Sequence, residues 1–243
     1  MKLTKYEKFI DYLQFFTDLK HKKFSSKVVN DTTIEFIGVK MPILRKLAKQ
    51  ISKNDYEDFL KFSGHKYFEE RAIHGLIIGY AKLDLDKLFK MLKDFVPYIS
   101  NWALCDLVAR KYCQFTENQD FAFKEVIKFT YSENSWEVRL GLVLLLNNFV
   151  NERFVDKILE ICKSVRSKNC GLKKGKKSQD YYVKMGNSWL ISQCYVKFPK
   201  VTEQFLKSKS LDKWTQNKAI QKIKESLRAN KKDKLRIESL KIK

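Results

Sequence analysis

An acidic side chain lies inside one of the most apolar segments of the chain. Asp106 ends the run Asn101-Trp102-Ala-Leu-Cys-Asp106 and lies four positions after Trp102. Residues four apart share one face of a helix, so the carboxylate and the indole would be neighbours. A carboxylate in a partly dry site can stabilise developing positive charge and orient a water molecule. The sequence alone supports equally a catalytic role and a structural role, in which Asp106 caps or bridges to a neighbouring helix.

A second charge is embedded in an apolar helix at Arg139, within Trp136-Glu-Val-Arg139-Leu-Gly-Leu-Val-Leu-Leu-Leu. Trp136 and Arg139 are three positions apart and share a face. A guanidinium in such surroundings needs an anionic partner. That partner is predicted to be either a phosphate or the carboxylate of Asp106, and a purely structural ion pair stays open as the alternative.

Aromatic rings among basic residues form a third group. Trp189 lies seven positions after Tyr182 and shares its face on a helix that begins near Tyr181. Trp214 begins the last long predicted helix, and Lys218 follows one turn later. Rings and ammonium groups together are typical of surfaces that bind nucleic acid. Core packing is the alternative for each single ring.

The net charge indicates the partner. Lys and Arg number 49 against 28 Asp and Glu, which gives a formal charge of +21. Such an excess opposes compaction by self-repulsion, and a polyanion is the simplest reason to keep it. The alternative is a lysine-rich codon usage without functional meaning. We therefore predict nucleic acid as the partner, and we expect the protein to be a monomer.

Several function classes are not expected. Neither the 5 cysteines nor the 3 histidines have the spacing of metal ligands, so no metal and no other cofactor is predicted. No apolar stretch reaches the roughly 18–20 residues of a membrane span, so no membrane partner is predicted. The start of the chain lacks the apolar region of a signal peptide. We expect a cytoplasmic location, at the nucleoid when DNA is bound.

One basic segment, residues 163–179, interrupts the apolar pattern and is predicted to be an exposed loop. It contains Gly-Leu-Lys-Lys-Gly-Lys-Lys-Ser, whose glycine spacing is one residue short of a phosphate-binding P-loop, and no strand precedes it. A loop lying along a phosphate backbone is therefore preferred to a nucleotide site.

Apolar residues at steps of three and four predict helices along most of the chain, with few turn residues (8 Gly, 3 Pro) between them. Residues 69–81, 101–113 and 136–149 are apolar helices, each preceded by a shorter amphipathic one. Trp102 and Trp136 are 34 residues apart, which suggests a repeating helix pair. The predicted fold is all-α: an α-α superhelix, or HEAT-like repeat solenoid, curved with a concave basic groove. Residues 1–228 are predicted to form one domain, followed by a basic tail, 229–243, that frays.

In order and spacing, these features resemble the AlkD-like DNA glycosylase family, a family of DNA alkylation repair enzymes with a HEAT-like fold. The resemblance covers about residues 36–228. It rests on residues 38–45, 101–108, 136–139 and 180–183 and on Trp189.

The family excises N3- and N7-alkylated purines from duplex DNA. The resemblance implies that Asp106 is the catalytic residue, that Trp102 and Trp189 contact the lesion's sugar, and that Arg139 holds a phosphate. The remaining predicted DNA-binding residues are Trp136, Tyr181, Tyr182 and Lys218. The implied activity is hydrolysis of the N-glycosidic bond in base excision repair.

Two departures keep alternatives open. Tyr181 and Tyr182 stand where the family has phenylalanines, and the basic segment 163–179 is long for the family. Because some relatives bind branched DNA without excising bases, the first alternative is a non-catalytic binder of branched or damaged DNA. A HEAT-type scaffold that acts through protein partners is the second.

Overall fold

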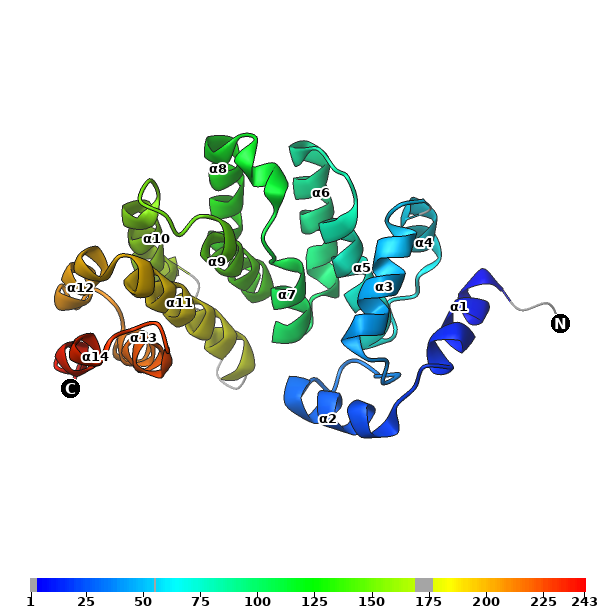
Figure 1. Ribbon diagram of the computed structural model, residues 1–243, viewed down its shortest axis with the longest axis horizontal. Helices are drawn as coiled ribbons and strands as arrows, with labels where there is room; N and C mark the ends of the chain where they lie inside the picture. The colour runs from blue at the N-terminus through cyan, green and yellow to red at the C-terminus, as the bar shows by residue number, and fades with distance from the viewer. Residues whose placement is uncertain (1–3, 55, 169–176) are drawn as a thin grey trace. The chain divides into compact units, whose positions relative to one another are not determined.

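The fold is built from α-helices joined by short connections (Figure 1). The computed structural model describes residues 4–54, 56–168 and 177–243, and this part of the chain contains no strand beyond one isolated parallel bridge between Glu35 and Tyr67. The all-α prediction is confirmed. None of the described helices is both long and apolar enough to cross a membrane.

In chain order the α-helices are α1 (Lys5–Gln14), α2 (Leu19–Val29), α3 (Met41–Ile51), α4 (Tyr56–Phe62), α5 (Phe68–Tyr80), α6 (Leu85–Phe95), α7 (Trp102–Val108), α8 (Gln119–Thr130), α9 (Ser135–Asn148), α10 (Val155–Lys168), α11 (Lys177–Lys197), α12 (Pro199–Lys207), α13 (Lys213–Glu225) and α14 (Lys231–Glu238). Two 3-10 helices, η1 (Val96–Tyr98) and η2 (Cys113–Thr116), lie before and after α7.

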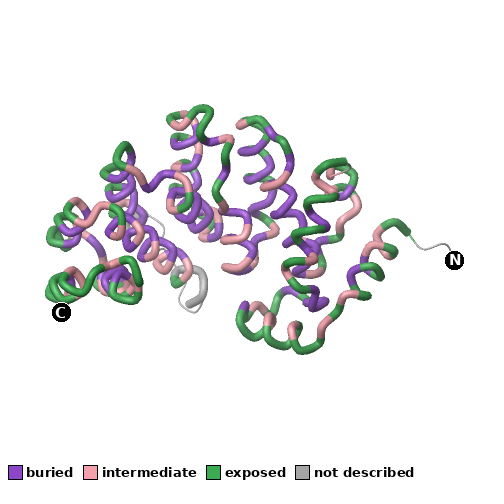
Figure 2. Tube along the Cα trace, in the orientation of Figure 1, coloured by how far each residue is buried: buried purple, intermediate pink, exposed green. Residues whose placement is uncertain are grey.

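The helices group into two compact units, Met1–Val108 and Ala109–Lys243. In the first unit α5 is central, since it packs against α3, α6 and α7. Figure 2 shows α5 buried along nearly its whole length. This burial explains why its sequence is apolar on almost every side.

The second unit repeats a helix pair. In it α9 and α13 both pack against α11, while α8 packs on α9 and α10 on α11. An apolar helix preceded by a more amphipathic one is the repeat unit predicted from the sequence, and the observed pairing agrees with a helical-repeat fold. The prediction of one domain over residues 1–228 stays a prediction, as do the curvature and the basic groove.

Side-chain caps determine where several helices begin. Asn134 Oδ1 accepts hydrogen bonds from the main-chain N–H groups of Trp136 (2.9 Å) and Glu137 (3.3 Å) at the start of α9. Asp212 Oδ1 accepts from the N–H of Thr215 (3.1 Å) at the start of α13. These short polar residues satisfy N–H groups that the first helical turn leaves unpaired. They therefore fix the first turns of α9 and α13.

One helix is shorter than the periodicity predicts. The apolar pattern favours a helix over 101–113, but α7 ends at Val108. Asn148 Nδ2 donates to the carbonyl of Arg110 (3.0 Å), and its Oδ1 accepts from the N–H of Tyr112 (2.8 Å). Asn147 donates to the carbonyl of Ala109. Because these two side chains take the main-chain groups that a longer α7 would use, the helix stops early.

The prediction of a frayed tail from residue 229 is wrong. Residues 231–238 form α14, and Ile237 is fully buried. The Nε2 of Gln216 donates to the carbonyl of Leu240 (2.6 Å), and Asn217 exchanges two hydrogen bonds of 2.9 Å with the main chain of Ile242. Contacts to α13 thus order a segment whose own composition predicts no packing.

The predicted exposed loop over 163–179 is wrong at both ends. α10 continues to Lys168, because Ile161, Cys162 and Val165 extend its buried face. α11 begins at Lys177. Residues 169–176, which include most of the P-loop-like sequence, lie outside the described residues.

Candidate functional site

α7 presents Trp102 and Asp106 on one face. Leu104 and Val108 on the opposite face are fully buried, whereas Trp102 and Asp106 are half-buried. The structure therefore places the indole and the carboxylate together in the first unit, as their spacing predicts. Half-burial lowers the local dielectric, and a carboxylate acts more strongly on nearby positive charge there than in water.

The start of α7 is held by a polar network. Asn101 is buried; its Oδ1 accepts from the N–H of Leu104 (3.0 Å), and its Nδ2 donates to Asp31 Oδ2 (3.0 Å). Desolvation raises the pKa of Asp31, but hydrogen bonds from Ser100, Thr33 and Asn101 outweigh it, so the net pKa is lowered. Asp31 thus stays charged and fixes the helix that carries Trp102 and Asp106.

A glycine brings α7 close to its supporting helix. A methyl group on Gly75 of α5 would lie 3.1 Å from Leu107 Cδ2 and 3.2 Å from Phe95 Cζ. Such contacts are tighter than normal packing allows. Gly75 therefore sets how closely α5 supports α7, and it helps to position Asp106.

In the second unit Arg139 joins two helices. Its side chain is 4% exposed on α9, and its Nη1 donates to the main-chain carbonyl of Tyr182 on α11 (2.7 Å). Gly186, one turn further along α11, lies beside this side chain, and a methyl group there would meet Nη1 at 3.5 Å, an ordinary van der Waals contact. A main-chain carbonyl was not among the predicted partners of Arg139, which were a phosphate and a carboxylate.

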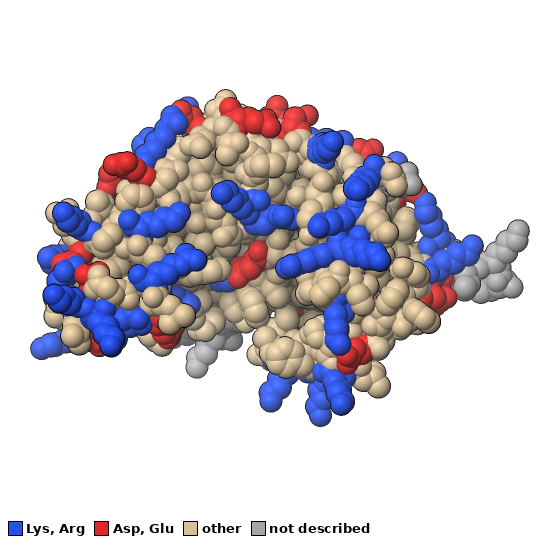
Figure 3. Space-filling view, viewed as in Figure 1, with Lys and Arg blue, Asp and Glu red and all other residues tan. Residues whose placement is uncertain are grey.

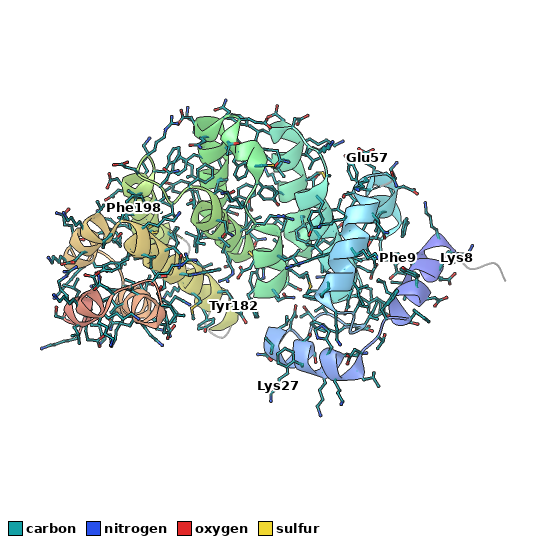
Figure 4. All side chains as sticks on the ribbon, in the orientation of Figure 1. Lys8, Phe9, Lys27, Glu57, Tyr182 and Phe198 are labelled. Atoms are coloured by element: carbon teal, nitrogen blue, oxygen red, sulfur yellow. The ribbon has the colours of Figure 1, made fainter. Side chains whose placement is uncertain are left out.

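Tyr182 also belongs to a row of four aromatic rings (Figure 4 labels it near the beginning of α11). Its ring lies 5.1 Å from that of Trp136 and 5.3 Å from that of Tyr181. Tyr181 meets Trp214 of α13 edge to face at 5.8 Å, and Lys218 Nζ lies 5.8 Å from the centre of the Trp214 ring. These side chains come from the first turn of α9, the first two turns of α13 and the N-terminal part of α11.

The row of aromatic rings is buried at one end and exposed to solvent at the other. Trp136 is buried, whereas Tyr181 and Trp214 are 45% and 36% exposed. Exposed rings beside an ammonium group can pack on sugars or bases, while the buried end keeps them in place. Core packing alone accounts for Trp136, but it does not account for Tyr181 and Trp214.

Trp189 lies two turns beyond Tyr182 on α11 and is half-buried. The hydroxyl of Ser192 donates to its main-chain carbonyl (2.7 Å). Of the predicted residues in the second unit, the structure thus brings Trp136, Arg139, Tyr181, Tyr182 and Lys218 into one connected cluster, and Trp189 lies further along the same helix.

One supporting residue was indicated by the sequence and one was not. Trp214, which the sequence places one turn before Lys218 at the start of a basic helix, links Tyr181 to Lys218. Asp31 anchors α7 from 70 residues away, and nothing in its local sequence indicates this. In the described part of the chain, no group of three or more His, Cys, Asp or Glu residues could hold a metal ion.

The protein carries a large net positive charge of +21. Figure 3 shows Lys and Arg side chains spread over the face it presents, with Asp and Glu among them. A protein with this excess of positive charge attracts phosphate backbones at long range.

The fold and these residues define a helical-repeat protein with a basic surface and one acid beside a tryptophan. The family model of the DNA alkylation repair enzymes matches residues 10–223 of the chain, so the chain belongs to that family. The resemblance drawn from the motifs is confirmed. Membership gives the chain a role in DNA repair, with DNA as its partner. No curated protein matches the chain.

Proposed function

We propose that the chain is an alkylpurine DNA glycosylase that removes N3- and N7-alkylated purines from duplex DNA. The observation that carries the proposal is Asp106 beside Trp102 on the half-buried face of α7, in a member of a DNA alkylation repair family. A protein that only binds phosphates gains nothing from a carboxylate there.

The reaction does not need a strong general acid from the protein. Alkylation at N3 or N7 makes the purine cationic, so the base leaves as a neutral molecule when the bond from sugar C1′ to the base nitrogen breaks. The electron pair of that bond neutralises the base. The sugar becomes oxocarbenium-like, and its positive charge is what the protein must stabilise.

Asp106 is assigned two tasks in this reaction. Its carboxylate stabilises the cationic sugar electrostatically, and it accepts a proton as a water oxygen adds to C1′. The products are the free base and an abasic site. Trp102 is assigned to pack against the lesion's sugar, where its ring face attracts positive charge and excludes bulk water. Trp189, in the second unit, is assigned to a ring contact with a sugar of the DNA.

The remaining predicted residues position the strand. Arg139, which also donates to the carbonyl of Tyr182, is assigned to a backbone phosphate. Tyr181, Tyr182 and Lys218 supply the surface on which the strand rests, and the buried ring of Trp136 supports Tyr182 from behind. Tyrosines can do this in place of phenylalanines, because the ring face is what packs on a sugar or base.

The test is single-turnover release of N7-methylguanine from duplex DNA by Asp106→Asn. Asparagine keeps the size of the side chain but neither carries the charge nor accepts the proton. We expect excision to slow by about a hundredfold or more, the scale on which electrostatic groups act in such steps. Binding to the same duplex should stay within about threefold, since a neutral residue repels phosphates less.

A matched acid-to-amide control is Asp86→Asn, which removes an exposed carboxylate from α6 in the same unit. It should excise at the wild-type rate. Near wild-type excision by Asp106→Asn would remove the catalytic assignment. If the wild type releases no base but binds a four-way junction more tightly than a duplex, the non-catalytic binder is the correct function. Failure to bind any duplex at low salt would favour the protein scaffold.

A further inference from the structure

A pocket of about 650 Å³ opens in the first unit, at the C-terminal ends of α3 and α5. Its volume is within the range of about 300–1,000 Å³ that small-molecule sites occupy. The lining residues are Lys46, Lys49, Gln50, Ser52, Lys53, Tyr56, Tyr80 and Lys82. None of them belongs to the site proposed for base excision.

Every charged residue in this described lining is a lysine. Three of them, Lys46, Lys49 and Lys53, lie at steps of three and four along and just after α3, so the helix points them to one side. Lys82 joins them from the segment after α5. Asp55, next to Tyr56 in the sequence, lies outside the described residues.

The neighbouring carboxylates have partners of their own. Glu57, labelled on α4 in Figure 4, pairs with Lys87 at 2.8 Å, and Asp58 pairs with Lys5. Among the residues that the structure describes, the lysines of the pocket form no ion pair. Lysines that meet no carboxylate of the described lining repel one another, and an anion would relieve this repulsion.

Two rings complete the chemistry of the pocket. Lys49 Nζ lies 5.4 Å from the centre of the Tyr80 ring, and Lys87 Nζ lies 5.4 Å from that of Tyr56. These contacts hold the rings beside the ammonium groups. Gln50 and Ser52 add an amide and a hydroxyl, which can hydrogen-bond to an oxyanion.

Stabilisation of helix ends explains part of this cluster. A cation in the last turn of a helix interacts favourably with the unpaired carbonyl groups, and Lys49 occupies that place in α3. The effect falls off within one turn, so it does not account for Lys46. Stabilisation of the ends of α3 and α5 also does not explain why a pocket lies between the lysines.

We infer that this pocket is a phosphate site, separate from the excision site, that binds phosphate esters or anhydrides. Ammonium groups serve as point charges for phosphate oxygens, and several converge here with neutral donors beside them. The phosphate can come from a nucleic-acid backbone or from a small phosphorylated molecule. Both sources share the chemistry that the pocket recognises, and the experiment separates them.

The experiment titrates the full chain with two probes, sodium tripolyphosphate and a short unmodified DNA duplex, by calorimetry. The variant Lys46→Gln/Lys49→Gln removes two charges from the pocket. The matched control, Lys90→Gln/Lys93→Gln, removes two exposed lysines with the same spacing from α6, and Lys93 also lies in the last turn of its helix. Thermal unfolding checks that both variants fold.

We expect the pocket pair to weaken binding of at least one probe about tenfold, because each lost lysine removes a charge-assisted contact. The control pair should stay within about twofold. Lys46→Arg/Lys49→Arg, which keeps the charge, should keep most of the binding.

The pattern of loss identifies the source. A selective loss with the duplex, together with a salt dependence shallower by about 2 for two lost contacts, assigns the pocket to backbone phosphates. A selective loss with tripolyphosphate alone assigns it to a small phosphorylated molecule. Equal losses in the pocket and control pairs, or no loss in the pocket pair, would overturn the inference. Because all these variants keep Asp106, base release at saturating protein tests the glycosylase proposal independently.

Discussion

The guanidinium of Arg139 and the main-chain carbonyl of Tyr182 are joined by a hydrogen bond of 2.7 Å that ties α9 to α11. The bond holds the part of α11 from which Tyr181 and Tyr182 project. A residue that the sequence marks as a phosphate contact thus also has a structural role. The two roles predict different behaviour when the charge is removed.

Arg139→Gln separates these roles, because glutamine keeps a buried polar side chain with an N–H donor but carries no charge. We expect it to weaken binding to any duplex. The slope of log affinity against log salt should become shallower by about 0.9, the value for one lost phosphate contact. Fluorescence anisotropy over a range of salt concentrations measures both quantities.

The control for this prediction is Arg153→Gln, which removes the same charge from an exposed side chain that pairs with Asp120. Its salt dependence should equal that of the wild type. If Arg139→Gln also leaves the slope unchanged while Arg139→Ala lowers the unfolding free energy, Arg139 serves only to hold α9 against α11.

Two buried histidines make the first unit sensitive to acid. His65 Nε2 lies 2.9 Å from His74 Nδ1, and His65 stacks on Tyr98 with ring centres 3.8 Å apart. Burial, followed by the charge on His65, lowers the pKa of His74 to about 3, and burial also lowers the pKa of His65 despite the carboxylate of Glu70. The folded unit therefore binds fewer protons than the unfolded chain below about pH 6.5.

Stability should be complete above this pH and fall as the pH decreases. Between pH 7.5 and 5 we expect the wild type to lose about 2 kcal/mol of unfolding free energy through His74, measured by urea denaturation. His74→Gln, which can still hydrogen-bond to His65 but does not titrate, should lose much less over the same range. An equal loss in both proteins would show that the pair does not cause the acid sensitivity.

A buried carboxylate organises the loop that leads into α3. Glu69 is 2% exposed and accepts hydrogen bonds from the N–H groups of Ile37 (2.9 Å), Gly38 (2.7 Å) and Val39 (3.2 Å). Gly38 has a φ of +104°, which only glycine adopts without strain. The carboxylate thus holds main-chain donors that have no helical partner.

Glu69→Gln should lower the unfolding free energy by about 2 kcal/mol or more, because an amide group replaces an oxygen that faces main-chain donors. Chemical denaturation measures the change. Glu35→Gln, at an exposed residue paired with Lys66, should stay within about 0.5 kcal/mol of the wild type. If the two variants were equally stable, the hydrogen bonds to Glu69 would contribute nothing net.

Local patterns predicted the features that depend on near neighbours in the chain. The step of three and four residues gave the helical class, and it placed Trp102 and Asp106 on one face of α7. The order of the motifs was enough to indicate the family. The periodicity did not indicate α2, because its apolar residues Leu19, Phe24 and Val28 are exposed and form no apolar stripe.

The sequence by itself therefore determined the helical fold class, the family and the shared face of Trp102 and Asp106, since helical periodicity is a local property of the chain. Only the tertiary structure decided that Arg139 meets a carbonyl 43 residues away, and that lysines of α3 gather beside Tyr80 of α5. It also decided that asparagines of α9 end the helical path after Val108. These contacts depend on how helices pack side by side, and the pattern within one helix does not specify which distant main-chain group or side chain it will meet.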